Sequence, residues 1–81
     1  MNYIVYVLES GKNGLRYIGY TQNLANRLKE HNSGGNVSTR SKGPWKLLCS
    51  EEQPTKSLAE KRERFFKSGH GRAVLKNLIG A

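Results

Sequence analysis

Two stretches near the start of the chain decide the fold: Tyr3-Ile4-Val5-Tyr6-Val7-Leu8 and Leu15-Arg16-Tyr17-Ile18-Gly19-Tyr20. Both are rich in β-branched and aromatic residues, and the turn-forming segment Ser10-Gly11-Lys12-Asn13-Gly14 separates them. This pattern predicts a β-hairpin. Because the side chains of the first stretch are apolar on both faces of the expected strand, we expect this strand to be central in the sheet and covered on both faces.

The register of the hairpin decides which tyrosines meet. If Leu8 lies opposite Leu15, then Tyr6 lies opposite Tyr17, and the two phenols are cross-strand neighbours on one face. A tight two-residue turn at Asn13-Gly14 would shift this pairing. Paired tyrosines are also ordinary sheet packing, so the pair alone assigns no chemistry.

A helix is predicted to follow, because Leu24 and Leu28 recur at helical spacing after Thr21 or Asn23, either of which can cap its N-terminus. The segment Ser33-Gly34-Gly35-Asn36 ends it.

Arg27 and His31 are four residues apart, so they form a second stripe on the same helix. The alternative for Arg27 is a solvated side chain, and for His31 a side chain that complements the helix dipole near the C-terminus.

The second half of the chain predicts one more strand and two more helices. A basic loop over residues 32–44 leads to a strand over Trp45–Ser50. A helix with a capping box is predicted next, because Pro54 and Thr55 are followed by Ser57-x-x-Glu60. After the break at 68–71, residues 72–79 form a short amphipathic helix. The expected fold class is α/β (α+β), a single domain over residues 1–81 with element order β-β-α-β-α-α and a three-stranded antiparallel sheet flanked by helices.

Glu63 interrupts an apolar stripe of the second predicted helix. Ala59, Glu63 and Phe66 share one face, whereas Glu60 lies nearer its edge. A carboxylate beside a buried face is costly unless it is paired with a cation or bound to one. A structural ion pair with Arg27, Arg62 or a lysine explains Glu63 as well as a functional role does.

The composition restricts the function further. The chain has 81 residues, with 14 Lys and Arg against six acidic residues, a formal net charge of +8 that favours polyanionic partners, nucleic acid ahead of membrane. All six acidic residues are glutamates, so a phosphate-handling site would hold one metal ion at most. The single cysteine, Cys49, forms no internal disulfide and indicates a reducing compartment, and no secretory signal or membrane span is visible, so we expect a cytoplasmic protein.

Several ordered motifs together resemble the GIY-YIG nuclease superfamily, and in particular its small stand-alone bacterial proteins, which are similar to the N-terminal nuclease domain of an excision-repair subunit. The resemblance extends from Tyr3 to about Ile79 and departs from the family at Ile4, where the first motif has glycine. Asn77 lies in the region where some members place an asparagine. The matching segments are Val5-Tyr6, Tyr17-Ile18-Gly19-Tyr20-Thr21, Arg27-Leu28-x-x-His31-Asn32, Gly43-Pro44-Trp45-Lys46-Leu47 and Ala59-x-x-x-Glu63.

The resemblance implies catalytic roles for five side chains. Tyr6 would accept the proton of an attacking water, and His31 is the second candidate for this role. A site containing Arg27 and a metal would lower the pKa of Tyr6. Arg27 would donate to the scissile phosphate, Tyr17 and His31 would orient Tyr6 or the water, and Glu63 would bind a single Mg²⁺ or Mn²⁺. At Gly19 a side chain would crowd the helix or the phosphate. The substrate-binding candidates are Gly19, Ser38, Thr39, Arg40, Lys42 and Lys46.

The first hypothesis is therefore a metal-dependent DNA endonuclease, with structure-specific or weakly sequence-specific cutting in DNA repair or nucleic-acid processing. The DNA could be single-stranded, branched or duplex, and a repair protein is a candidate partner. The alternative is a repair-accessory or nucleic-acid-binding module with the same fold and little catalysis. A third hypothesis is a structural RNA-binding protein, for which the basic charge alone suffices.

Overall fold

The computed structural model describes residues 2–33 and 43–80. Three strands and three helices follow one another in the predicted order: β1 (Tyr3–Ser10), β2 (Arg16–Thr21), α1 (Leu24–Ser33), β3 (Trp45–Gln53), α2 (Lys56–Lys67) and α3 (Gly69–Ile79). The fold is α+β, as the sequence predicted. None of the helices in the described ranges is long and apolar enough to cross a membrane.

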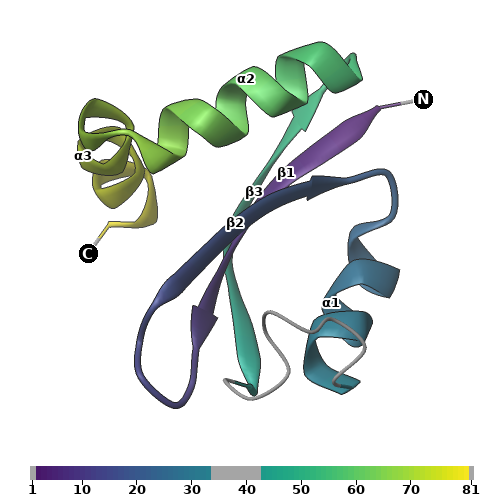
Figure 1. The fold of residues 1–81 in the computed structure, drawn as a ribbon, viewed down its shortest axis with the longest axis vertical. Coiled ribbons are helices and arrows are strands. Elements are labelled where there is room, and N and C mark those ends of the chain that lie inside the picture. Colours follow the sequence, from purple (N-terminus) through teal and green to yellow (C-terminus); the bar gives the residue numbers. More distant parts are fainter. Residues whose placement is uncertain (1, 34–42, 81) are drawn as a thin grey trace.

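The sheet is antiparallel and has the strand order β2-β1-β3 (Figure 1), so the strand that is apolar on both faces is the central one. Val5, Tyr6, Val7 and Leu8 are all buried. This agrees with the prediction, because a strand between two neighbours and between two helical layers meets protein in every direction.

The hairpin register differs from the expected one by two residues. Leu8 lies opposite Tyr17, and Tyr6 lies opposite Gly19. The cause is the position of the turn, which is centred one residue later than expected: Ser10 N donates a hydrogen bond to the Leu15 carbonyl at 2.8 Å, and Gly14 N donates one to the Ser10 carbonyl at 3.0 Å. Leu15 is 58% exposed. Because side chains alternate with a period of two, Tyr6 and Tyr17 still share a face, but as diagonal neighbours.

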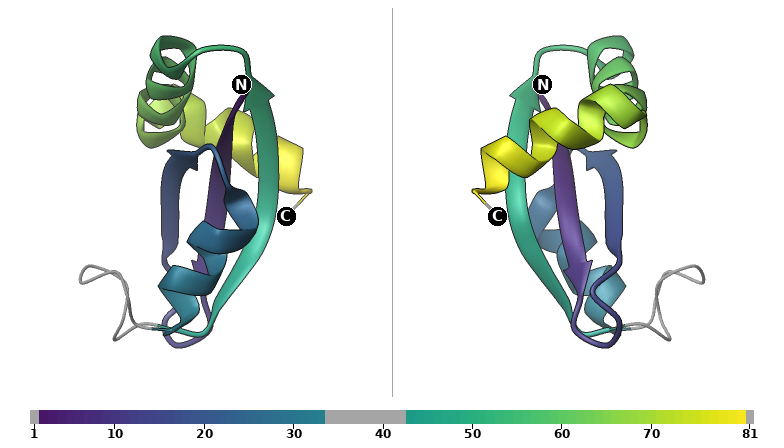
Figure 2. Two further views of the ribbon diagram at one scale, coloured as in Figure 1. Left: turned by 90° about the vertical axis from the view of Figure 1, so that its right-hand side faces the viewer. Right: turned by 90° about the vertical axis from the view of Figure 1, so that its left-hand side faces the viewer.

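The two faces of the sheet carry separate cores. Helix α1 covers the face with Tyr6, Leu8 and Trp45, where Leu24 and Leu28 pack. Helices α2 and α3 cover the other face and pack on a larger core: Val5, Val7, Ile18, Ala59, Phe66 and Leu75. Figure 2 shows α1 and α3 on opposite sides of the sheet.

Two element boundaries differ from the predicted ones in the region of β3 and α2. Strand β3 continues to Gln53 because it pairs with β1 as far as Tyr3. Helix α2 is capped by Thr55, whose Oγ1 accepts a hydrogen bond from Leu58 N at 3.2 Å, so the expected capping box at Ser57 does not form.

Helix α3 begins at Gly69, three residues before the predicted start at Arg72. Ser68 alone separates α2 from α3, and its Oγ accepts a hydrogen bond from Gly71 N at 3.0 Å. A Cβ at Gly71 would collide with the carbonyl oxygen of Phe65, so only glycine allows the helices to meet this closely. The glycines that we expected to interrupt the chain instead form the first turn of α3.

Candidate active site

The candidate site is centred on a buried hydrogen bond between β1 and α1. The Tyr6 hydroxyl lies 3.1 Å from Nε2 of His31, and the two residues are only 2% and 1% exposed. His31 is at this position because α1 packs Leu24 and Leu28 on the sheet and presents the residue one turn further along to β1. His31 is therefore a buried partner of Tyr6, and not a solvent-facing residue that complements the helix dipole.

Burial keeps both groups neutral. Burial, with a smaller contribution from Tyr17, raises the pKa of Tyr6 to about 12. Arg27 acts in the direction that the sequence predicted, since its charge lowers the pKa of Tyr6, but burial outweighs it. Burial, and then the charge of Arg27, lowers the pKa of His31. At neutral pH a protonated phenol thus faces a neutral imidazole, and the tautomer of His31 decides which of them donates.

Tyr17 and Trp45 surround this pair with aromatic rings. The centroid of the Tyr17 ring lies 4.9 Å from that of His31 and 6.4 Å from that of Tyr6. The Trp45 ring lies 6.2 Å from Tyr17 and 6.4 Å from His31. Tyr17 is half-buried, so it forms the partly exposed side of the cluster. The structure thus brings together three of the predicted catalytic residues, Tyr6, Tyr17 and His31.

Asn32 is a residue of the site region to which the sequence reasoning assigned no role. Its Oδ1 accepts a hydrogen bond from Trp45 N at 2.6 Å, and its Nδ2 donates to Trp45 O at 3.3 Å. This pair of bonds joins the end of α1 to the start of β3 and fixes Trp45 beside His31. Asn32 follows His31 directly in the sequence, and this position beside a motif residue was the only indication in the sequence that Asn32 lies at the site.

The atoms that a side chain at Gly19 would meet belong to Tyr6 and Tyr17, and not to a helix, which is one of the two neighbours that the sequence predicted. A Cβ at this position would lie 2.7 Å from the Tyr6 hydroxyl and 2.9 Å from its Cζ. Both distances are shorter than side-chain carbons tolerate. The missing side chain on β2 therefore makes the space in which the Tyr6 hydroxyl reaches His31.

Arg27 lies on α1 one turn before His31, and its side chain is 40% exposed. Its Nη1 is 4.0 Å from Oε2 of Glu30, a long and weak ion pair on the helix surface. Its charge lowers the pKa of both Tyr6 and His31. The guanidinium is therefore near the buried pair and also accessible to an anion from solvent.

Glu63 approaches the same region from α2. Its charge raises the pKa of Tyr6 and also that of Tyr20, which lies on the other face of β2. Glu63 thus lies near the edge of the sheet formed by β2. Its side chain is 20% exposed, against 39% for Glu60, whose Oε1 accepts a hydrogen bond from the Tyr20 hydroxyl at 2.8 Å.

The carboxylate of Glu63 is suited to a cation. Its Oε1 accepts a hydrogen bond from Lys67 Nζ at 2.8 Å, so a lysine is the ion-pair partner that the structure shows. This pair is partly exposed, and such pairs contribute less than about 1 kcal/mol. A hard carboxylate oxygen is also the ligand that Mg²⁺ and Mn²⁺ prefer. Within the described ranges no three His, Cys, Asp or Glu residues cluster as metal ligands, so Glu63 would be the protein's main contribution.

The predicted substrate-binding residues are not all near this site. Lys46 is exposed and lies opposite Glu9, on the face of the sheet away from Tyr6. Ser38, Thr39, Arg40 and Lys42 lie outside the described residues.

Comparison with known proteins assigns the family. Residues 2–77 match the model of the GIY-YIG catalytic domain, and the chain belongs to this family. The family is one of endonucleases, whose substrates are nucleic acids and which generally depend on divalent metal ions.

Among its relatives, a UPF0213 protein of Streptococcus sanguinis is 43% identical over 72 residues, covering 88% of this chain and 82% of that protein. A UPF0213 protein of Clostridium perfringens is 44% identical over 68 residues, covering 83% of this chain and 71% of that protein. The solution NMR structure of a UPF0213 protein from Bacillus halodurans is similar, with a TM-score of 0.59 and 37% identity, and the match covers 96% of this chain and 85% of that one.

Proposed function

We propose that this protein is a metal-dependent DNA endonuclease that hydrolyses a phosphodiester bond by attack of water. The observation that carries the proposal is the Tyr6–His31 hydrogen bond, which lies within the electrostatic reach of both Arg27 and Glu63. In this proposal the proton acceptor on β1, the phosphate-binding cation on α1 and the metal-binding carboxylate on α2 act on one phosphate group.

Tyr6 and His31 act as one proton-accepting unit in this proposal. With a pKa of about 12, roughly one Tyr6 in 10⁵ is ionised at pH 7, so the phenolate alone is a scarce base. The hydroxyl oxygen takes a proton from water as its own proton passes to Nε2 of His31. Tyr6 then stays neutral throughout, and the imidazole carries the positive charge. Burial lowers the pKa of His31, so the imidazole is neutral at neutral pH, and in the tautomer protonated at Nδ1 its Nε2 accepts the proton.

The remaining residues bind and orient the substrate. The Arg27 guanidinium donates to the phosphate oxygens, where negative charge develops during the reaction. Tyr17 forms the accessible side of the cluster and positions the phosphate against Tyr6. Glu63 would hold one Mg²⁺ or Mn²⁺ after exchange of the Lys67 ammonium. When bound, this ion would supply a Lewis acid that stabilises the leaving oxygen.

The test is a cleavage panel of single-stranded, duplex, flap and junction DNA, with Mg²⁺ and with Mn²⁺. We expect Glu63→Gln and Tyr6→Phe to lower the cleavage rate by about 10²- to 10⁴-fold while DNA binding is largely retained. Glu60→Gln is the matched control, because it removes a charge from the same helix, and it should cleave as the wild type does. Undiminished cleavage by both site variants would refute the mechanism. The preferred DNA structure in this panel also tests the proposed structure-specific role in DNA repair.

A nucleic-acid-binding module with little catalysis is the second candidate, and the burial of Tyr6 favours it. A phenol that is 2% exposed and has a raised pKa is shielded from bulk water. This candidate predicts that the wild-type protein binds DNA but does not cut any member of the panel with either metal. Metal-dependent cutting that is lost in Glu63→Gln excludes it.

A further inference from the structure

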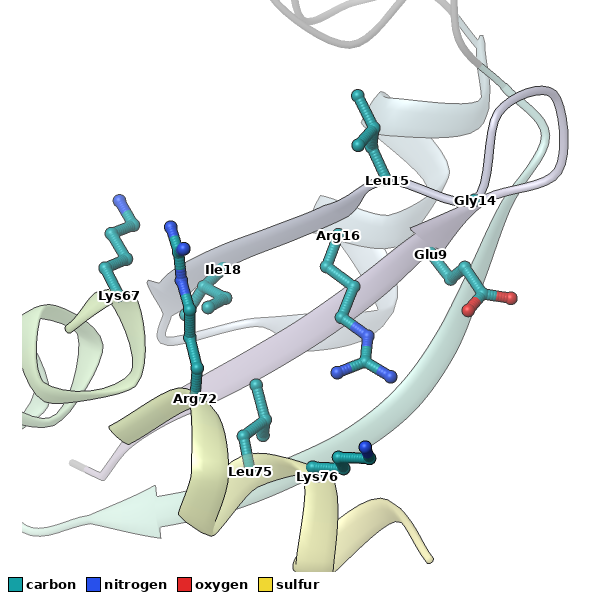
Figure 3. Close-up of a pocket in the computed structure, with 9 residues that line it drawn as sticks. All are labelled: Glu9, Gly14, Leu15, Arg16, Ile18, Lys67, Arg72, Leu75 and Lys76. Atoms are coloured by element: carbon teal, nitrogen blue, oxygen red, sulfur yellow. The ribbon is translucent and has the colours of Figure 1, made fainter. Parts of the chain in front are cut away.

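A basic cleft lies on the face of the sheet opposite to the Tyr6–His31 pair. Nine residues line it, and Figure 3 shows their side chains. They come from the β1–β2 hairpin, the end of α2 and helix α3: Glu9, Gly14, Leu15, Arg16, Ile18, Lys67, Arg72, Leu75 and Lys76. We propose that this cleft binds the phosphodiester backbone of the nucleic acid flanking the cleaved bond, an inference that rests on the proposed function.

The lining of the cleft is strongly basic. Four of its nine lining residues are cationic, Arg16, Lys67, Arg72 and Lys76, and only Glu9 is acidic. Arg16, Arg72 and Lys76 are exposed, and none of the three forms an ion pair within the described part of the chain. Three cations that form no ion pair thus gather from β2 and α3 around one hollow, and they favour a polyanion because they outnumber Glu9, the one carboxylate in the described lining.

The backbone that carries these cations is held firmly. Arg72 and Lys76 are four residues apart on α3, so they extend from the same face of the helix. Ser68 joins α3 to the end of α2 with a hydrogen bond from its Oγ to Phe65 O at 2.6 Å, in addition to its cap on α3. Leu75 and Ile18, both in the larger core, underlie the cleft. The cations therefore have fixed points of attachment, which lowers the entropic cost of binding an extended ligand.

Lys67 connects the cleft with the candidate active site. It lines the cleft and also contacts Glu63, one helical turn earlier on α2. A strand whose cleaved bond lies at Glu63 would thus reach the cleft by passing the edge formed by β2 and the end of α2. The two sites lie on opposite faces of the sheet but are adjacent along this edge.

The lining of the cleft also predicts the kind of contact. Among its described lining residues none is aromatic and none carries a side-chain amide, so it has neither a platform for stacking bases nor a group that reads adenine. Arginine and lysine beside leucine and isoleucine suit phosphates and sugars. Because contacts to phosphates carry no sequence information, we expect this cleft to bind nucleic acid without sequence preference.

The experiment compares two double variants that each remove two positive charges. Arg72→Ala/Lys76→Ala changes the cleft, and Lys56→Ala/Lys61→Ala changes exposed lysines of α2 that do not line it. Lys67 is left intact because it contacts Glu63. Binding of labelled duplex DNA is measured by fluorescence anisotropy in EDTA over a range of salt concentrations, and circular dichroism verifies that both variants are folded.

We expect the cleft variant to bind about 3- to 30-fold more weakly than the wild type. The slope of log K against log salt concentration should fall by about 1.8, which corresponds to two lost phosphate contacts. The control pair should change both quantities less. Equal losses in the two double variants, or no loss in the cleft variant, would overturn the inference.

Cleavage in Mn²⁺ separates this inference from the proposed function. The cleft variant should raise KM for long DNA and leave kcat, and the cleavage of a short oligonucleotide, unchanged. If the cleft variant binds normally while Glu63→Gln abolishes cleavage, the cleft inference fails and the proposed function stands. If the wild-type protein cuts no DNA with either metal while the cleft variant binds more weakly and with a smaller salt slope, the proposed function fails and the cleft still binds nucleic acid.

Discussion

Replacing Gly19 by alanine tests the packing on which the candidate site depends. The new Cβ would lie 2.7 Å from the Tyr6 hydroxyl, and ordinary contact begins at 3.4 Å, so the hydroxyl must retreat by roughly 0.7 Å. Tyr6 has little freedom to do so, because its ring is buried and its hydroxyl is bonded to His31. Overpacking of this kind costs about 1–3 kcal/mol.

Thermal unfolding followed by circular dichroism measures this cost. We expect the melting temperature of Gly19→Ala to fall by about 4–8 °C for each kcal/mol of lost stability. If the protein cleaves DNA as proposed, kcat should fall by about 10- to 100-fold, because the proton acceptor is displaced by most of an ångström. Gly69→Ala is the matched control, since a Cβ there meets nothing within 4 Å.

A double-mutant cycle with Tyr6→Phe identifies the contact responsible. Phenylalanine removes the hydroxyl oxygen, which is the atom nearest to the new Cβ, so the double variant should be about 1 kcal/mol more stable than the sum of the single effects predicts. Strictly additive effects, or a Gly19→Ala variant as stable as the wild type, would refute the argument that Gly19 exists to accommodate Tyr6.

Three further outcomes are expected. Because the pKa of His31 is lowered in the folded protein, His31 stabilises the fold above its unfolded pKa, and stability should fall with decreasing pH below about 6.5, by at most about 1.4 kcal/mol per pH unit. Urea titrations should show that His31→Gln reduces this slope and that the exposed His70→Gln does not. Lys67→Met should tighten Mn²⁺ binding by about two- to fivefold, because the ammonium no longer competes for Glu63; calorimetry that finds no change would argue against Glu63 as the ligand. Asn32→Ala should cost about 1–3 kcal/mol in chemical denaturation, since both of its hydrogen bonds to the first residue of β3 are lost.

Local patterns in the sequence were sufficient to predict the order of the elements. The doubly apolar stretch around Val5 indicated the central strand, and the spacing of Leu24 and Leu28 indicated α1, because burial periodicity is a property of neighbouring residues. The same periodicity identified Glu63 as an anomaly on α2, where the structure shows it paired with Lys67. The motifs also indicated the family, which the comparisons confirm.

Tertiary structure alone decided what each residue touches. The hairpin turn set the register, so Tyr6 lies opposite Gly19, and no pattern within either strand encodes the position of that turn. Burial between β1 and α1 turned His31 into a partner of Tyr6 and raised the pKa of the phenol, although the charges in the sequence favoured a lower one.

Tertiary structure also decided where the positively charged side chains gather. The count of 14 Lys and Arg predicted a polyanionic partner, but it could not place Arg16 beside Arg72 and Lys76, which are more than 50 residues away along the chain. Sequence therefore determined which chemical groups this protein carries and which elements hold them. Only the packing of those elements decided which groups meet, because desolvation and charge interactions depend on distances through space rather than along the chain.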